Sequence, residues 1–479
     1  MAYRDDYFDT PEFKEKLHTY EEAAQQGNTV YMESEDLVDI AEFYHSRDEF
    51  DQSLAAINYA IDMFEGATLP LVFRARMALF HEDDTDKADD FAEQIDDKTD
   101  LDYFYIKAEI MLVKDQAEAA DEFLTANIDR IDEDDREDYV VDVATLFADY
   151  EVFDKAQKWL SMVEDQTSVE FKELKGRIAM GKGNYEESES IFNELIEDDP
   201  YSVPYWNNLA SSQYLRNHIN ESITSSEFSI AINPDDDEAI LNKANGLFSL
   251  GNYEEALTYY RRFSEVCSEE DTGEYFQGIT LINLNRPEEA IPHLKKAEEL
   301  SAEHSPNLKE IRRELAFALS RTGKLDEALA YAGKIKIQNK DDEVEIMTLK
   351  GHIYLENEHP EEAQECFRYA MSNSKKPGGT VFRIAVSAYD CGYIPLAYKM
   401  LHAVIDELTD PTNNVGYSYL ALCCRRLGKT EEFLETLKQA CERNPEEAKA
   451  TLGEMFPPDI EPKDYYNFLI NNEQQIEFS

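Results

Sequence analysis

Small side chains recur along the chain at a fixed spacing, and larger apolar side chains stand around them. One series steps by 34 positions through Gly176, Ala210, Ala244 and Gly278, and a second steps through Ser188, Ser222, Ala256 and Ala290. Leucine, tyrosine or phenylalanine stands three or four positions from most of these residues, which is the spacing of neighbours on one face of an α-helix. A small residue in the middle of each helix lets two helices approach closely. The pattern therefore predicts a helical hairpin in every 34-residue segment.

Glycine and proline mark where the predicted helices end. Glycine stands in the turn inside the hairpin at Gly251, Gly323 and Gly428, where its tolerance of positive φ ends the first helix. The second helix ends at a proline in the pairs Asp199-Pro200, Asn233-Pro234 and Asn444-Pro445, because a residue that precedes proline disfavours the helical conformation. The two signals alternate along the chain, as expected for helix–turn–helix units.

The hairpin pattern extends over most of the 479 residues. It is clear in residues 169–447 and more degenerate, as well as more acidic, in residues 34–168, which gives about twelve hairpins in all. Terminal repeats of a stacked array must cover an exposed apolar face, so the flanking segments are expected to be caps. We predict a capping helix in residues 1–33, beginning with an N-cap at Thr10 and Pro11. Capping helices and a tail are predicted in residues 448–479.

A 34-residue helix–turn–helix unit with small residues at two fixed positions, a large residue near its start and proline at its end resembles the tetratricopeptide repeat (TPR). A single copy would be weak evidence, whereas a period that persists over many copies is specific. The chain resembles cytosolic TPR arrays of bacterial type. This resemblance implies an all-α fold, a right-handed superhelical solenoid of about twelve helix–turn–helix repeats with helical caps.

The net charge of the chain is −56, from 46 basic and 102 acidic side chains. Residues 1–200 hold 55 acidic and 18 basic side chains, so this part carries a net charge of −37. Such a surface repels phosphate backbones, and we expect no binding to nucleic acid. It would attract basic partners. The acidity is equally consistent with a simpler role, which is to keep a long array soluble.

The sequence predicts a cytoplasmic protein with no membrane segment. It holds no apolar stretch of about 18 residues, the length that a membrane helix needs. The first residues, MAYRDDYFDT, are acidic and lack the basic and apolar regions of a secretory signal. The six cysteines form no CxxC pair, and Cys423 and Cys424 are adjacent. Free, buried thiols in a reducing compartment are the expected state, with a redox or metal site as the competing interpretation.

Signatures of catalysis and of cofactor binding are missing from the sequence. The nine histidines are scattered, and none lies in an HExxH pattern or at zinc spacing from a cysteine. Gly181 to Gly183 resembles part of a phosphate-binding loop but falls in an inter-helix turn. The acidic runs at residues 81–86 and 129–138 lack the glycine and the closing glutamate of a calcium loop. We therefore predict a protein that is not an enzyme and that holds no cofactor or metal.

In proteins of the TPR family, the first helices of successive repeats line a concave groove that takes an extended peptide or a helix. Carried onto this sequence, the groove-facing positions are Arg177, Asn207, Ser211, Tyr214, Asn245, Phe248, Tyr275, Arg313, Phe317, Phe382 and Tyr389. Asparagine can hold a peptide backbone by paired hydrogen bonds, and aromatic residues and arginine are common in binding hot spots. The competing interpretation is that the aromatic rings pack against the neighbouring repeat.

The resemblance implies a scaffold or adaptor that binds a protein segment in the concave TPR groove. The acidic surface favours a basic or mixed-charge segment. Glutamate stands at Glu170, Glu173 and Glu238, where TPR proteins that grip an acidic tail place basic residues, so that kind of partner is not expected. The alternative function is a peptide-responsive regulatory protein whose superhelix changes curvature when a short signalling peptide binds.

Overall fold

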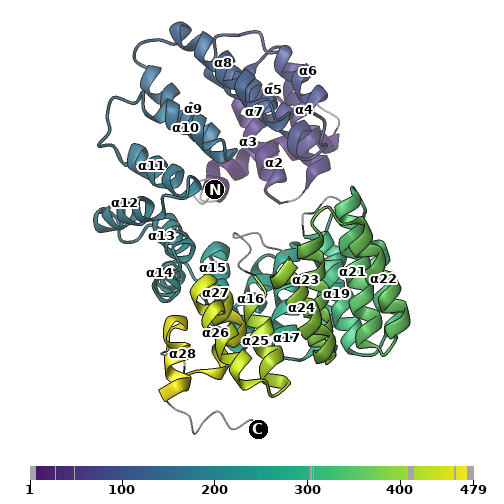
Figure 1. The fold of residues 1–479 in the computed structure, drawn as a ribbon. Coiled ribbons are helices and arrows are strands. Elements are labelled where there is room, and N and C mark those ends of the chain that lie inside the picture. Colours follow the sequence, from purple (N-terminus) through teal and green to yellow (C-terminus); the bar gives the residue numbers. More distant parts are fainter. Residues whose placement is uncertain are drawn as a thin grey trace. The chain divides into compact units, whose positions relative to one another are not determined.

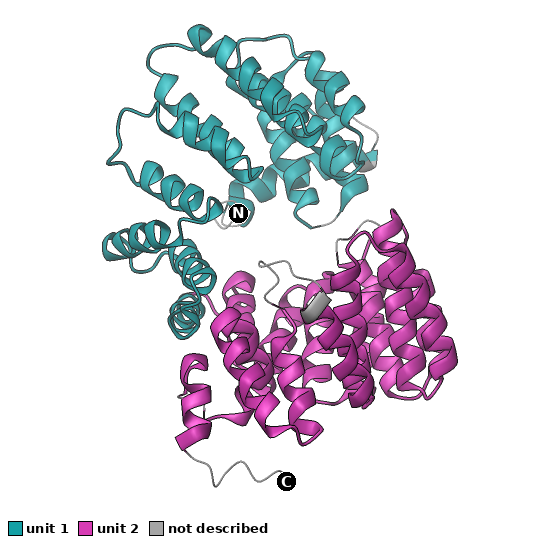
Figure 2. Ribbon diagram, viewed as in Figure 1, with its two compact units in different colours: residues 1–232 teal, residues 233–479 magenta. Residues whose placement is uncertain are grey.

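The structure, a computed structural model of the chain, describes residues 7–26, 29–47, 49–302, 305, 307–407, 415–457 and 460–471. Throughout these residues the regular structure is helical, with two short 3₁₀ helices beside the α-helices. The helices belong to two compact units, residues 1–232 and residues 233–479 (Figures 1 and 2). The predicted all-α fold is confirmed.

Unit 1 holds the helices up to residue 232. They are α2 (Pro11–Gln26), α3 (Ser34–His45), α4 (Phe50–Met63), α5 (Thr68–Phe80), α6 (Thr85–Glu93), α7 (Leu101–Val113), α8 (Ala117–Asn127), η1 (Ile128–Arg130), α9 (Arg136–Asp149), α10 (Phe153–Leu160), α11 (Val169–Gly181), α12 (Tyr185–Asp198), α13 (Val203–Leu215) and α14 (Ile219–Ile232).

Unit 2 holds the remaining helices. They are α15 (Asp237–Ser249), α16 (Tyr253–Val266), α17 (Asp271–Asn283), α18 (Pro287–Leu300), α19 (Leu308–Arg321), α20 (Leu325–Lys334), α21 (Lys340–Glu356), α22 (Pro360–Asn373), α23 (Pro377–Asp390), α24 (Ile394–Glu407), α25 (Tyr417–Arg426), α26 (Thr430–Arg443), α27 (Pro445–Leu452), η2 (Gly453–Met455) and α28 (Pro462–Asn471).

Consecutive helices pack in pairs, from α3 with α4 to α25 with α26, so the described chain contains twelve helical hairpins. This agrees with the number predicted from the period. In unit 2 the first helices of neighbouring hairpins also pack on each other, α17 on α19, α19 on α21 and α21 on α23. The first helices therefore form a continuous layer of their own in this part of the solenoid.

From the α5–α6 hairpin to the α25–α26 hairpin, each turn places one residue in the left-handed backbone region. Gly251, between α15 and α16, has φ +77°, and the N–H groups of Gly251 and Asn252 donate to the carbonyl oxygens of Phe248 and Leu247 at 2.9 Å. These two bonds close the C-terminus of α15. Positive φ recurs at the corresponding turn positions, Asp83, Asp115, Glu151, Gly183, Asn217, Asn285, Gly323, Glu358, Gly392 and Gly428. Glycine therefore marks only some of the turns, and the others use aspartate, asparagine or glutamate.

Within a hairpin, a small residue of the first helix lies against a large residue of the second, 16 positions later in the sequence. A Cβ atom on Gly351 would lie 2.3 Å from a ring carbon of Phe367. The same construction places a Cβ on Gly278 2.5 Å from Leu294, and one on Gly176 2.9 Å from Phe192. Real Cβ contacts are longer than this, so these positions need small residues for the two helices to approach. This contact is the physical basis of the 34-residue period.

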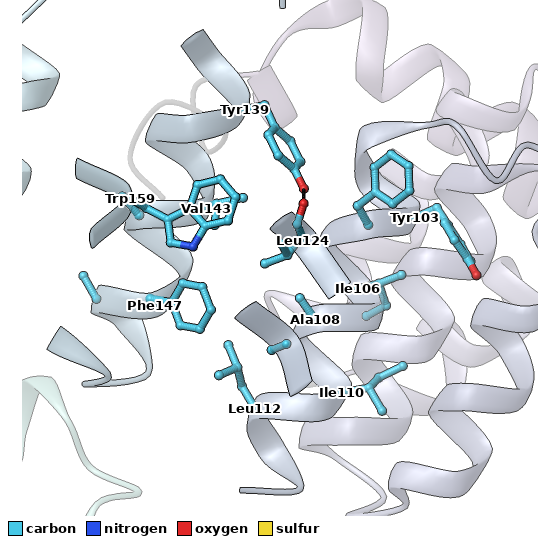
Figure 3. Close-up of a cluster of buried hydrophobic side chains, with 14 of the residues drawn as sticks. Tyr103, Ile106, Ala108, Ile110, Leu112, Leu124, Tyr139, Val143, Phe147 and Trp159 are labelled. Carbon is cyan, nitrogen blue, oxygen red and sulfur yellow. Dashed lines mark hydrogen bonds between the residues drawn. The ribbon is translucent and has the colours of Figure 1, made fainter. Parts of the chain in front are cut away.

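The core of unit 1 contains the largest fully buried side chains of the described chain. Trp159 of α10 and Tyr139 of α9 are both fully buried and meet edge to face, with ring centroids 6.0 Å apart. Figure 3 shows both residues in one buried cluster with Phe147, and the hydroxyl of Tyr139 donates to the carbonyl oxygen of Leu124 at 3.0 Å. The degenerate repeats of unit 1 are thus held together by aromatic packing as well as by small-residue contacts.

Helices lie at both ends of the described chain, where the capping segments are predicted. The hydroxyl oxygen of Thr10 accepts a hydrogen bond from the N–H of Phe13, at 3.3 Å, and Pro11 is the first residue of α2. At the other end, α27 and α28 both pack on α26. The predicted tail, residues 474–479, lies outside the described residues. Among the residues that are described, no helix combines the length and the apolar character needed to cross a membrane.

Candidate functional site

A hollow of about 570 Å³ opens among the first helices of unit 2. Most of its lining comes from α19, α21 and α23, with Ile282 of α17, Ile335 after α20 and Tyr419 of α25 at its edges. We call it the α19–α23 hollow. Its volume lies within the usual range for ligand-binding clefts, about 300–1,000 Å³.

The repeat register explains which side chains line the hollow. Ala316, Gly351 and Ala385 are the small packing residues of α19, α21 and α23. Positions three before, one after and five after a given residue share one face of a helix. Three positions before the small residue, the three helices hold Arg313, Thr348 and Phe382. One position after it they hold Phe317, His352 and Val386. Five positions after it they hold Arg321, Glu356 and Asp390. All of them except Glu356 line the hollow.

The middle of the hollow is apolar and aromatic. The ring of Phe317 meets the imidazole of His352 edge to face, with centroids 5.0 Å apart, and Phe382 meets Tyr419 in the same way at 5.9 Å. Phe317, Phe382, Tyr419 and Val386 are half-buried, so each presents part of its surface to the hollow. Side chains held in this way offer apolar surface without having to reorganise when a ligand binds.

Basic side chains gather toward the N-terminal ends of the three helices, and each is already paired within the chain. The ammonium of Lys309 lies 2.8 Å from Asp342 and 3.1 Å from Glu345. The guanidinium of Arg383 lies 3.2 Å from Glu345. Arg313 pairs with Glu310 and lies 3.4 Å from Glu314. This end of the hollow therefore has little uncompensated positive charge.

The C-terminal ends of the same helices carry two carboxylates beside one guanidinium. The Nε atom of Arg321 lies 4.0 Å from Glu356, which also accepts a hydrogen bond from the hydroxyl of Ser320. Within the described residues, the carboxylate of Asp390 forms no hydrogen bond and no ion pair. Burial raises the pKa of Glu356, partly offset by Ser320 and Arg321. Burial also raises the pKa of Asp390, although its side chain reaches solvent, with Glu356 adding to the rise and Arg321 opposing it.

Two buried polar side chains in the wall of the hollow have unused hydrogen-bonding capacity. His352 is 9% exposed and Ser387 is 8% exposed. In the part of the chain that the structure describes, neither the imidazole nor the hydroxyl forms a hydrogen bond, and the carboxylate nearest to His352 is that of Glu356, 3.9 Å from Nε2. Burial and the neighbouring Arg321 lower the pKa of His352 to about 4. The neutral imidazole can therefore both donate and accept a hydrogen bond.

Three of the residues selected from the sequence, Arg313, Phe317 and Phe382, line the α19–α23 hollow. Tyr389 lies beside it on α23, with its ring 5.9 Å from that of Tyr419. Burial raises the pKa of Tyr275 of α17 to about 12, and the charges of Glu314 and Glu310 add to the rise. Tyr275 therefore lies near Glu314, which lines the hollow. These five residues form one neighbourhood in unit 2.

The other selected residues lie elsewhere. Asn245 of α15 accepts a hydrogen bond from the hydroxyl of Tyr260 at 2.8 Å, and the ring of Phe248 packs on Tyr253. In unit 1, Arg177 of α11 forms an ion pair with Asp149, Asn207 of α13 is buried at 3% exposure, and Ser211 and Tyr214 are half-buried on the same helix. The six selected rings are all half-buried, so packing on neighbours takes part of each ring and leaves the rest accessible.

Several lining residues were missed, and His352 and Asp390 are the most informative of them. They occupy the same repeat positions as Phe317 and Arg321. Ala316 and Gly351 are 35 residues apart, and Gly351 and Ala385 are 34 residues apart. A count in strict steps of 34 residues therefore places the repeat positions of α21 one residue too early. Counting from the small residue of each repeat would have found them.

Metal and thiol chemistry find no support in the geometry. Among the described residues, no group of three or more histidine, cysteine, aspartate or glutamate side chains is arranged to hold a metal ion. The six cysteines are free thiols. Burial raises the pKa of Cys423 to about 12 and that of Cys424 to about 11, which keeps both thiols protonated and unreactive near neutral pH.

Family models of the tetratricopeptide repeat match residues 241–305 and residues 344–376. The first segment covers most of α15 and all of α16 to α18. The second covers most of α21 and all of α22. Both models describe a repeat, and neither describes an enzyme. A search of curated proteins finds no match.

Three solved structures are similar to parts of the chain. One is YrrB, described as a TPR protein with an unusual peptide-binding site, at 22% identity over 38% of this chain and 92% of that one, with a TM-score of 0.34. A TPR protein from Parabacteroides merdae is 17% identical over 52% and 96% of the two chains, with a TM-score of 0.42. The Cut9–Hcn1 structure of the APC/C is 13% identical over 88% and 95%, with a TM-score of 0.38.

Proposed function

Because the chain is a tetratricopeptide-repeat protein, we propose that it acts as an interaction scaffold that binds a segment of another protein in the α19–α23 hollow. The observation that carries this proposal is the hollow itself, a recess of about 570 Å³ in which aromatic surface adjoins unused hydrogen-bonding groups. TPR arrays serve as protein-interaction scaffolds, and their partners are proteins or peptides.

The proposed anchor points are Phe317 and Phe382, with Arg313 at the basic end and Tyr275 and Tyr389 at the periphery. Aromatic side chains that are partly buried lose little conformational freedom on binding, and they are enriched at the centres of interfaces together with arginine. A partner's apolar side chain seated in the hollow would be shielded from water by the aromatic lining. The neutral groups His352 and Ser387 would hydrogen-bond the partner's backbone.

The strong negative charge favours a basic or mixed-charge segment as the partner. At a net charge of −56, the long-range field attracts cations and repels acidic segments. This field increases the rate of encounter, whereas the short-range contacts in the hollow determine which segment stays bound. High salt should therefore slow association more than it weakens a complex already seated in the hollow.

We expect Phe317→Ala/Phe382→Ala to abolish retention of the partner, because it removes both apolar walls of the hollow. The measurement is affinity capture from native lysate at low and at moderate salt, comparing this variant with the wild type. Since both phenylalanines are half-buried, circular dichroism must first show that the variant keeps its helical content.

A matched control removes two exposed aromatic rings outside the hollow. Phe80 is 61% exposed and Tyr201 is 78% exposed, and both lie in unit 1. The Phe80→Ala/Tyr201→Ala variant should retain the same partner as the wild type. If all three proteins retain one set of partners, and salt releases that set equally from each, attraction to the acidic surface accounts for the binding and the hollow does not.

A further inference from the structure

The two ends of the α19–α23 hollow differ in how well their charges are compensated. At the N-terminal end, Lys309 and Arg383 each have carboxylate partners within 3.2 Å. At the C-terminal end, the guanidinium of Arg321 lies 4.0 Å from Glu356 and opposes the charge of Asp390, whose carboxylate forms no ion pair within the described residues. An incoming anion would have to displace existing ion pairs at one end or meet two carboxylates at the other. An incoming cation meets uncompensated negative charge at the C-terminal end.

The repeat geometry fixes the distance between the apolar and the acidic parts. Phe317, His352 and Val386 stand four residues before Arg321, Glu356 and Asp390 in their helices, and four helical residues span about 6 Å. In an extended peptide, side chains two positions apart lie on the same side and are separated by about 7 Å. An apolar side chain over Val386 and a cationic side chain near Asp390, both residues of α23, therefore fit positions i and i+2 of one extended segment.

His352 and Ser387 lie in the wall between these two parts and give an independent indication of a ligand. Each is more than nine-tenths buried, lines the hollow and forms no side-chain hydrogen bond within the described residues. A ligand that displaces water from these two groups must supply a hydrogen-bond partner in its place. A peptide backbone offers both a donor and an acceptor, which match a neutral imidazole and a hydroxyl.

Resting on the proposed function, we infer that the hollow recognises an extended segment in which an apolar side chain and a lysine or arginine stand two positions apart. The apolar side chain lies over Val386, next to Phe382 on the same face of α23. The cation lies at Asp390, and the nearby charge of Glu356 adds to the attraction. The backbone between them bonds to His352 and Ser387. Arg321 opposes the incoming cation, so its presence limits the affinity for basic segments.

The probes are fluorescein-labelled heptapeptides, and binding to the full chain is measured by fluorescence anisotropy at low and at moderate salt. The sequences Gly-Ser-Phe-Ser-Lys-Ser-Gly and Gly-Ser-Lys-Ser-Phe-Ser-Gly test the two chain directions. Further peptides carry glutamine or glutamate in place of lysine, or serine in place of phenylalanine. We expect one of the two lysine peptides to bind at least about fivefold more tightly than its glutamine counterpart, as a partly desolvated ion pair allows. The glutamate and the serine peptides should bind more weakly still.

Two variants test the acidic end with opposite signs. Asp390→Asn/Glu356→Gln should remove the preference for lysine over glutamine. Arg321→Gln should strengthen binding of the lysine peptide severalfold, because it removes the opposing cation. Glu361→Gln is the matched control, since it removes one exposed carboxylate from the second helix α22. It should leave the preference intact.

Equal or stronger binding of the glutamate peptide would overturn the inference, as would a preference that survives Asp390→Asn/Glu356→Gln, or no binding of any lysine peptide. The proposed function fails separately. If the Phe317→Ala/Phe382→Ala variant loses its captured partner but the peptides show no preference for lysine, the hollow is the site and its charge selectivity is wrong. If capture is unaffected by that variant, the site itself is wrong.

Discussion

Trp159→Ala is expected to destabilise unit 1 by about 4–5 kcal/mol, near the upper end for removal of a large side chain from a core. Trp159 is fully buried and packs against Tyr139 (Figure 3). Its indole N–H donates to the carboxylate of Asp121 at 2.9 Å. The alanine variant would leave a large cavity and remove one of the donors that compensate a buried carboxylate, so both effects act in the same direction.

The remaining partners of Asp121 allow the two effects to be separated. Lys155 and Lys158 also contact this carboxylate, at 3.0 and 2.7 Å. Trp159→Phe keeps most of the packed volume and loses only the indole donor, so it should cost about 1–2 kcal/mol. Trp206→Ala makes the same substitution at a half-buried tryptophan stacked on Phe228, and it should cost about 1–2 kcal/mol.

The measurement is urea denaturation followed by circular dichroism, with hydrogen exchange to locate the change. Repeat arrays can unfold in parts, so a single midpoint would not be sufficient. Exchange in the Trp159→Ala variant should accelerate in α7 to α11 and much less in α19 to α26. If Trp159→Ala and Trp206→Ala lower the free energy of unfolding by the same amount, the buried aromatic cluster does not hold the degenerate repeats together.

Gly351→Leu is expected to destabilise unit 2 by about 3 kcal/mol or more, because it places a bulky side chain where even a Cβ atom would lie 2.3 Å from the ring of Phe367. The intrinsic helix propensity of leucine works in the opposite direction, by about 1 kcal/mol. A large observed cost would therefore report the close contact between α21 and α22 rather than a property of the helix alone.

A control and a rescue make this test specific. Gly333 lies in α20 with no atom within 4 Å of a built Cβ, so Gly333→Leu should be neutral or stabilising by up to about 1 kcal/mol. Phe367→Ala makes room for the new side chain, so the double variant Gly351→Leu/Phe367→Ala should be more stable than the sum of the two single effects predicts. Strict additivity in denaturant unfolding would contradict the contact that we take as the origin of the repeat period.

The same contact explains why the fold could be predicted from the sequence. A small residue facing a large one 16 positions later, repeated at about 34 residues, can be satisfied only if each hairpin brings its two helices close. Gly278 with Leu294 and Gly351 with Phe367 both obey this rule. The turns were predictable where glycine occupies them, as at Gly251. They were not evident at Glu151, where a glutamate adopts positive φ that tertiary packing imposes.

The candidate site was predictable only in part, because it depends on the convergence of several helices. Phe317 and Phe382 follow from the repeat position alone. The difference in charge compensation between the two ends of the hollow cannot be predicted in this way. It depends on which carboxylates lie close to Lys309, Arg321 and Arg383 in the folded chain. Asn207 and Asn245 have the right residue type at the expected register. However, Asn207 is buried, and Asn245 accepts a hydrogen bond from Tyr260.

Site-specific photo-cross-linking tests the central claim most directly. A benzoylphenylalanine residue in place of Tyr419, at the edge of the α19–α23 hollow, is compared with one in place of the exposed Tyr201 in unit 1. We predict that irradiation in lysate links the probe at Tyr419 to one defined segment of a partner protein. Adding Phe317→Ala/Phe382→Ala should abolish this adduct, and the probe at Tyr201 should give no defined adduct. Adducts from Tyr201 alone, or an adduct at Tyr419 that persists without the two phenylalanines, would contradict the proposal that the hollow is the binding site.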